Sequence, residues 1–114
     1  MSAFHLTIQT PEAVAFDQDV EAIVVPGLRG QFGVLAHHAP LRAAVEKGIL
    51  KVTASAQELY FAVGAGFADV RRDGVHLIVD AALPAANEFE ASEKLRAYAK
   101  SVALPPRVTA DSPL

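Results

Sequence analysis

Apolar and polar residues alternate along much of the region 4–80, and this alternation predicts a series of short β-strands. In the first of these, residues 4–10, Phe4, Leu6 and Ile8 fall on one face of the strand and the residues between them on the other. Further strands are expected at residues 13–17, 20–25, 41–45, 49–54, 58–63, 67–70 and 75–80, with a brief strand pairing at residues 33–35. Many short strands at regular spacing are typical of an antiparallel sandwich or a flattened barrel.

Turn residues separate these strands. Asp17-Gln18-Asp19 and Ser55-Ala56-Gln57 are predicted turns, and Asp73-Gly74 is typical of a tight hairpin. Gly64-Ala65-Gly66 predicts a bulge or kink in the sheet. The aromatic residues Phe61 and Phe67 on either side of it are expected in the core.

After Asp80 the pattern changes from strand to helix. Asn87 is a suitable N-cap, and the next apolar residues recur at helical spacing up to Pro105, which cannot continue a helix. The apolar face predicted for this helix consists of Ala91, Leu95, Tyr98, Ala99 and Val102. The predicted fold class is therefore mainly β with a short α C-terminus. We expect a flattened antiparallel β-sandwich domain over residues 1–83, a single helix over residues 84–104 and a disordered tail over residues 105–114.

Composition narrows the class of protein. A chain of 114 residues has room for one principal domain, and 52% hydrophobic with 20% charged residues is globular rather than disordered. The net charge of −3 gives no broad basic field, which argues against a nucleic-acid or anionic-membrane binder. With no run approaching the ~20 apolar residues of a spanning helix, we expect a soluble protein, or one held at a membrane through a partner.

Residues that could bind a metal or take part in catalysis give only weak evidence of a site. His37 and His38 suggest a metal site, with His5 and His76 as further ligands, but adjacent side chains of an extended segment point to opposite faces. Surface or interface histidines are the preferred interpretation. No nucleophile elbow surrounds any serine, and the glycine-rich loop 27–33 lacks the Lys-Ser/Thr ending of a phosphate loop. We therefore expect no catalytic residue, no bound metal and no cofactor.

Several short motifs, read in order, point to a family. They are Thr10-Pro11-Glu12, Val25-Pro26-Gly27, Gly30-Gln31-Phe32-Gly33-Val34-Leu35, His38-Ala39-Pro40-Leu41, Gly48-Ile49-Leu50 and Gly64-Ala65-Gly66-Phe67. Each motif alone is common, but their collinear order from about His5 to Ala82 resembles the epsilon subunit of F-type ATP synthase, whose mitochondrial counterpart is called delta.

The resemblance implies a non-catalytic rotor subunit of the central stalk. Such a subunit joins the gamma subunit to the membrane c-ring and couples proton flow to ATP synthesis. It lies on the cytoplasmic face of the bacterial inner membrane, where only the complex holds it. By position in the family's motifs, the implied c-ring contacts are Leu28, Arg29 and Gln31. The implied gamma contacts are Thr10, His38, Leu41, Arg42 and Ala43.

The chain departs from the family pattern at several places. The family usually has Pro-Gly before the His-Ala-Pro-Leu run, where this chain has Ala36-His37, and Gln31 occupies a position often held by an acid. Family members commonly end in two helices, and some bind ATP through a basic-residue-plus-alanine pair that the region 90–94 lacks. We expect no nucleotide site, and weak or absent inhibition by helix extension.

A second class of function is a small-ligand or metal-binding β-barrel that uses His37, His38 or His76. A carrier domain of this kind would need a lysine at a hairpin tip, and a cupin enzyme would need inward-facing histidines two positions apart on one strand. The Asp73-Gly74 and Ser55-Ala56-Gln57 turns have no such lysine, and no predicted strand has such a pair of histidines. The rotor subunit is therefore the preferred interpretation, and the barrel is its alternative.

Overall fold

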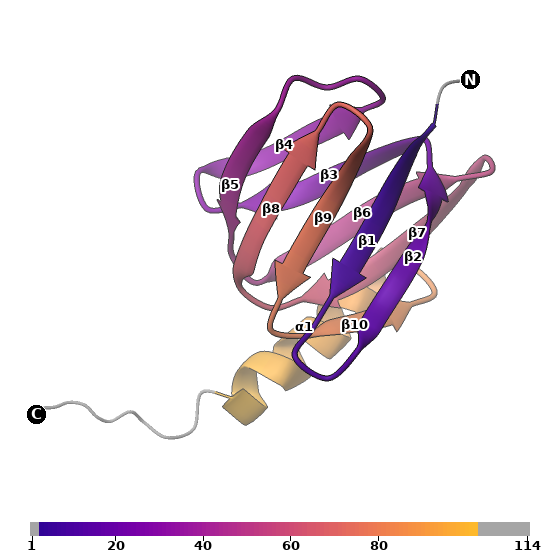
Figure 1. The fold of residues 1–114 in the computed structure, drawn as a ribbon. Coiled ribbons are helices and arrows are strands. Elements are labelled where there is room, and N and C mark those ends of the chain that lie inside the picture. The colour runs from indigo at the N-terminus through magenta and orange to yellow at the C-terminus, as the bar shows by residue number, and fades with distance from the viewer. Residues whose placement is uncertain (1–2, 103–114) are drawn as a thin grey trace, which may run out of the picture.

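The computed structural model describes residues 3–102. In this part of the chain ten strands precede one helix (Figure 1). The strands are β1 Phe4–Gln9, β2 Val14–Val20, β3 Ala22–Gly27, β4 Gly30–Leu35, β5 Leu41–Val45, β6 Gly48–Ala54, β7 Gln57–Val63, β8 Gly66–Arg71, β9 Gly74–Val79 and β10 Ala82–Ala85, and the helix is α1 Glu88–Val102.

The strands form two layers that face each other. One layer runs in the order β10-β7-β6-β3, with β4 beyond β3, and the other in the order β5-β8-β9-β1-β2. The layers meet where Gly27 at the end of β3 pairs with Val45 at the end of β5. Figure 1 shows the second layer in front of the first. The predicted sandwich is confirmed, although one of its pairs, β1 with β9, is parallel.

Apolar side chains fill the space between the layers. Phe4, Leu6 and Ile8 are buried, as the alternation predicts. Among the described residues, no polar or charged residue is buried. Leu50 and Leu77 are fully buried. Burying a side chain of this size contributes roughly 1.5–3 kcal/mol. The sandwich is thus stabilised mainly by its apolar interior.

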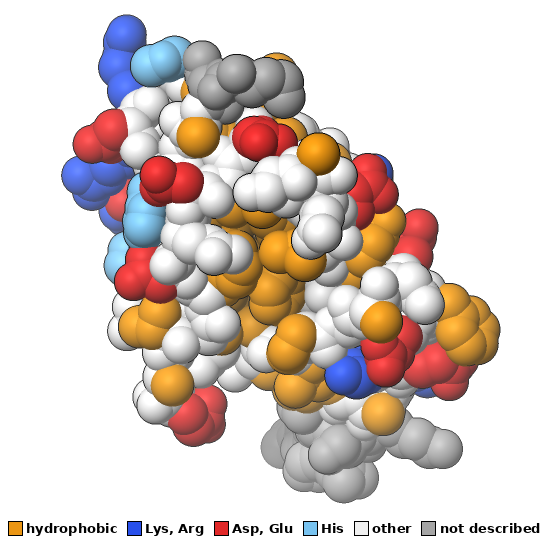
Figure 2. All heavy atoms as spheres, turned by 90° about the vertical axis from the view of Figure 1, so that its right-hand side faces the viewer, with side chains coloured by type: hydrophobic (Ala, Val, Ile, Leu, Met, Phe, Trp, Pro, Cys, Tyr) orange, Lys and Arg blue, Asp and Glu red, His pale blue; other side chains and the backbone are white. Residues whose placement is uncertain are grey.

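An aromatic pair closes the side of the sandwich opposite the β3–β5 junction. The rings of Phe16 on β2 and Phe61 on β7 meet edge to face with centroids 5.5 Å apart. Leu59 and Ala54 also pack against the core in a partly buried state. Figure 2 shows apolar side chains gathered in the middle of this side of the molecule. Phe61 is in the core, as predicted.

Two features of the strands differ from the sequence prediction. Asp17-Gln18-Asp19, predicted as a turn, lies inside β2, because His5 on the neighbouring β1 bonds both carboxylates and keeps this polar stretch in the sheet. The strand β10 was not predicted. It contains Pro84, which a sheet tolerates at its edge, and it pairs only with β7.

Two connections between strands have unusual backbone requirements. Ser55 and Ala56 form the two-residue turn between β6 and β7 with φ values of 52° and 62°, a left-handed geometry that tight hairpins require and that asparagine and glycine adopt more easily. Gly64-Ala65-Gly66 carries the chain from β7 in one layer to β8 in the other. A Cβ at Gly66 would lie 1.9 Å from the carbonyl oxygen of Ile78, so only glycine fits this approach.

The helix begins after the predicted N-cap, Asn87, although residues 84 and 85 of the predicted helix belong to β10. The backbone amide of Glu90 donates to Asn87 Oδ1 at 2.8 Å, which is the expected N-cap bond. Ala91 is fully buried, and Leu95 is half-buried. The Lys94 ammonium donates to the carbonyl oxygen of Pro84 at 2.6 Å and so ties the helix to β10. Within residues 3–102, no helix has the length and apolar character to cross a membrane.

The predicted boundary at residues 83 and 84 falls inside β10. The division into a sandwich domain and a helix stays a prediction. The predicted tail, residues 105–114, lies outside the described residues, as do the side chains of Ala99 and Val102 on the predicted apolar face.

A histidine between two carboxylates links the edge strand β2 to β1. His5 Nδ1 lies 2.8 Å from Asp19 Oδ1, and His5 Nε2 bonds Asp17 Oδ1. Ionised carboxylates only accept hydrogen bonds, so both ring nitrogens must donate, which requires the imidazolium form. The hydrogen bond to Asp17, followed by that to Asp19, raises the pKa of His5 above 6.5.

We predict a stability difference that depends on pH when His5 is changed to glutamine. A folded-state pKa above 6.5 means that the stabilisation is fully present below the unfolded pKa and is lost as pH rises through the folded one. Wild type should therefore melt above His5→Gln at about pH 6 and lose this advantage at about pH 8.5. Circular dichroism melting measures both. A melting difference between wild type and His5→Gln that is the same at both pH values would contradict the raised pKa of His5. His37→Gln is the control variant.

Candidate functional site

The hairpin of β3 and β4 ends in an exposed two-residue turn, Leu28-Arg29. Leu28 is 61% exposed. Glycine flanks the turn on both sides. Gly30 has φ 121°, and a Cβ at Gly27 would lie 2.7 Å from the carbonyl oxygen of Gly30. The glycines therefore permit a tight tip that projects an apolar and a basic side chain into solvent.

Backbone hydrogen bonds fix this tip to the neighbouring strand β5. The amide of Leu28 donates to the carbonyl oxygen of Ala44 at 2.9 Å, and the amide of Glu46 donates to the carbonyl oxygen of Pro26 at 3.0 Å. Together with the pairing of Gly27 and Val45, these bonds join the hairpin to the second layer. The tip is therefore an ordered surface.

The connection from β4 to β5 carries the two adjacent histidines. His37 adopts φ 65°, a left-handed geometry that favours glycine. His38 is half-buried, and its Nδ1 donates to the carbonyl oxygen of Ala39 at 2.7 Å. This bond sets the direction of the His38 ring at the start of β5.

On β5, Arg42 faces outward and is held by two neighbours. Its guanidinium lies 5.6 Å from the centre of the Phe67 ring and 3.5 Å from Asp69. Asp69 also accepts from Arg71 at 3.0 Å, and this bond is the main reason that the pKa of Asp69 is lowered. Phe67, predicted in the core, is 38% exposed, because it stands on the outer face of β8 beneath Arg42.

Thr10 lies at the end of β1, away from the hairpin tip. Its hydroxyl donates to the carbonyl oxygen of Ala13 at 3.1 Å and also accepts from the Ala13 amide at 3.3 Å. It lines a shallow groove of about 340 Å³ together with Phe67 and Ile78. The exposed ring of Phe67 therefore extends from Arg42 towards Thr10 along the outer face of the second layer.

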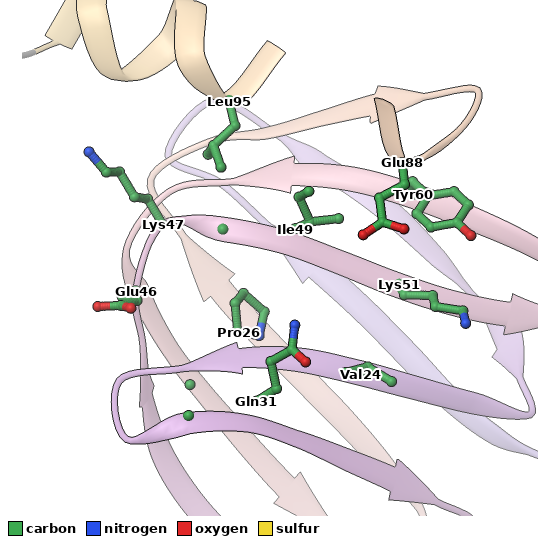
Figure 3. Close-up of a pocket in the computed structure, with 13 residues that line it drawn as sticks. Val24, Pro26, Gln31, Glu46, Lys47, Ile49, Lys51, Tyr60, Glu88 and Leu95 are labelled. Carbon is green, nitrogen blue, oxygen red and sulfur yellow. The ribbon is translucent and has the colours of Figure 1, made fainter. Parts of the chain in front are cut away.

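Gln31 points to the other side of the hairpin. It lines a groove of about 580 Å³ that lies on the outer face of β3 and β6 and reaches α1 (Figure 3). In Figure 3, Leu95 extends from the helix towards the strand that carries Ile49. Lys51 and Tyr60 lie at the far end of this groove, and both bond Glu58, at 3.2 Å and 3.0 Å. The hydrogen bond with Lys51 is the main cause of a lowered pKa of Glu58.

The structure thus separates the predicted contact residues into groups. Five of them line a single groove of about 380 Å³ between the hairpin tip and β5, namely Leu28, Arg29, Leu41, Arg42 and Ala43. Gln31, His38 and Thr10 lie outside it. Sequence reasoning missed Phe67 and Asp69, which hold Arg42, because only the pairing of β5 with β8 brings them beside it.

The histidines do not form a common site. His5 and His76 line one groove of about 270 Å³ but bond different partners, since His5 bonds Asp17 and Asp19 whereas His76 Nε2 lies 3.1 Å from Gln9 Oε1. Among the residues that the structure describes, no group of three or more potential ligands could hold a metal ion. The interior is filled by apolar side chains, so the arrangement does not favour a ligand-binding barrel.

Comparisons with known proteins agree with this architecture. Residues 3–85 match the family model of the ATP synthase delta/epsilon chain β-sandwich domain. The ATP synthase epsilon chain of Rhodopseudomonas palustris strain TIE-1 is 46% identical over 85 residues, which are 75% of this chain and 63% of the relative. The epsilon chain of Afipia carboxidovorans is 43% identical over 82 residues, 72% of this chain and 60% of the relative.

Solved structures share the fold at low sequence identity. A chain of the Euglena gracilis mitochondrial ATP synthase aligns with a TM-score of 0.72 and 24% identity, over 95% of this chain and 70% of that one. A chain of the Tetrahymena thermophila central stalk and c-ring aligns with a TM-score of 0.65 and 11% identity, over 99% and 81%.

The match to the curated relatives spans less than two thirds of their length. The family model, matched over residues 3–85, covers the whole sandwich from β1 to β10, in which the exposed hairpin tip and the outer face of β5 are found. By this match, the chain belongs to the ATP synthase delta/epsilon chain family, through its β-sandwich domain.

Proposed function

We propose that this chain is a non-catalytic rotor subunit in the central stalk of a bacterial F-type ATP synthase. In this role it joins the gamma subunit to the c-ring and couples ion flow to ATP synthesis. The observation that carries the proposal is the family match over residues 3–85. The chain lies on the cytoplasmic face of the inner membrane and is held there only through the complex.

The proposed gamma contacts are Thr10, His38, Leu41, Arg42 and Ala43. Exposure supports this role, because Leu41 is 39% exposed and Arg42 stands on the outer face over Phe67. An arginine held over an aromatic ring beside an exposed leucine has the composition that protein interfaces favour. Phe67 and Ile78 continue this apolar surface towards Thr10.

The proposed c-ring contacts are Leu28, Arg29 and Gln31 at the end of the β3–β4 hairpin. These side chains are exposed and lie on a tip that hydrogen bonds fix to β5. Such a tip contacts a second partner without moving relative to the first. Transmission of torque requires this rigidity, which the packed interior and the bonded tip supply.

The chain is proposed to have no nucleotide site and no catalytic residue of its own. The region 90–94 has an acid where the family's ATP motif has its basic residue, and Lys94 is engaged by the carbonyl oxygen of Pro84. Without that basic residue, the motif lacks the cation that would bind a phosphate group. We predict no heat of binding when ATP is titrated into the protein in a calorimeter. Saturable ATP binding would contradict the prediction.

We predict that the chain binds purified gamma subunit saturably and that His38→Glu weakens this binding by about tenfold. The substitution places a carboxylate in the half-buried corner at the start of β5, where an interface would have to desolvate it. Isothermal titration calorimetry gives both affinities. Gln31→Lys, on the other side of the hairpin, is the control and should leave gamma binding unchanged while weakening assembly with a c-ring.

Two results would count against the proposal. Absence of gamma binding by wild type at micromolar concentration would remove the rotor role itself. Equal affinities of wild type and His38→Glu would leave the role standing and remove the corner from the gamma contact. Circular dichroism of each variant confirms that the sandwich is folded before its affinity is compared.

A further inference from the structure

We propose that the groove between the hairpin tip and β5 binds an acidic segment of the gamma subunit that also carries an apolar side chain. We call it the arginine groove, and the residues that define it are Leu28, Arg29, Phe32, Leu41, Arg42 and Ala43. The inference rests on the proposed function and specifies the chemistry of one of its contacts. It assigns Leu28 and Arg29 to the gamma interface as well as to the c-ring.

The walls of the arginine groove are apolar. Leu28 is 61% and Leu41 39% exposed, and Phe32 and Ala43 are half-buried between them. The groove has a volume of about 380 Å³, which is room for one or two side chains of a partner. An apolar side chain of a partner would bury the exposed leucine surface on both sides of this groove, which is favourable.

The charges that line the arginine groove are all positive. Arg29 and Arg42 belong to its lining, and no acidic residue does. Arg29 forms no ion pair with any residue in the region 3–102. Arg42 contacts Asp69, but that single carboxylate is shared with Arg71, so the group as a whole keeps a positive charge. A carboxylate on the partner would complement both arginines.

The arginine groove is preorganised. One wall is the tip, and the other is β5, and the bond from the Leu28 amide to the carbonyl oxygen of Ala44 joins them at 2.9 Å. Gly27 at the base pairs with Val45 and has no room for a side chain. A cavity with fixed walls loses little conformational entropy when a partner enters it.

The arginine groove is continuous with the proposed gamma contact, and this indicates which partner binds in it. Leu41, Arg42 and Ala43 are proposed gamma contacts on β5, and the same three residues form one wall of the arginine groove. A gamma segment that lies along β5 therefore reaches Arg29 without leaving this surface. Gln31 faces the separate groove on the other side of the hairpin and is not part of this contact.

The test uses the full chain and soluble gamma subunit without a c-ring. Wild type, Arg29→Glu, Arg29→Gln and the control Arg72→Glu are titrated into gamma at low and high salt. Arg72 is exposed in the β8–β9 turn and does not line the arginine groove, so its reversal changes the net charge equally. We expect Arg29→Glu to weaken binding about tenfold, Arg29→Gln to weaken it less and Arg72→Glu to change it less than about twofold.

Salt supplies an independent readout. Added salt should weaken the binding of wild type more than that of Arg29→Glu, because the variant lacks the attraction that salt screens. Wild-type binding that Arg29→Glu does not change, or changes no more than Arg72→Glu, would overturn the inference and leave the rotor role standing. No binding by wild type would remove the proposed function and the inference together.

Discussion

The structure depends on the apolar interior between its two sheets. Every buried side chain that the structure describes is apolar, from Phe4 and Leu6 on β1 to Leu77 on β9. With no polar group buried there, the interior places no requirement for a ligand, a metal or water at the centre of the molecule. The candidate site therefore lies on the surface, and the sandwich is a rigid support for the exposed side chains of the hairpin tip and β5.

The junction of the two layers determines where that surface lies. β3 pairs with β6 and β4 in one layer and reaches β5 of the other at Gly27, so the hairpin tip is held beside β5. The same junction brings Arg29 and Arg42 to one groove, although Arg29 lies on the β3–β4 hairpin of one layer and Arg42 on β5 of the other. A rotor subunit needs such a fixed relation, because it must touch two neighbours at once without changing its own shape.

Strand positions were largely predictable because an alternating pattern determines which side chains face the core. The prediction failed where a tertiary contact outweighs local preference. His5 keeps Asp17 and Asp19 in a strand, and the edge position of β10 accommodates Pro84. Phe67 was misplaced because an aromatic residue beside a glycine-rich kink is usually buried, and only the β5–β8 pairing reveals that it supports Arg42. The site residues came from the order of family motifs, and their grouping around one groove required the fold.

Amide hydrogen exchange of the chain, alone and bound to gamma subunit, tests the central claim most directly. The account predicts slower exchange on binding at residues 27–30 and 38–45, on both walls of the arginine groove. The Ser55-Ala56 turn lies at the end of β6 away from this junction and should exchange at the same rate in both states. Protection confined to that turn or to α1, with the tip and β5 unaffected, would contradict the account.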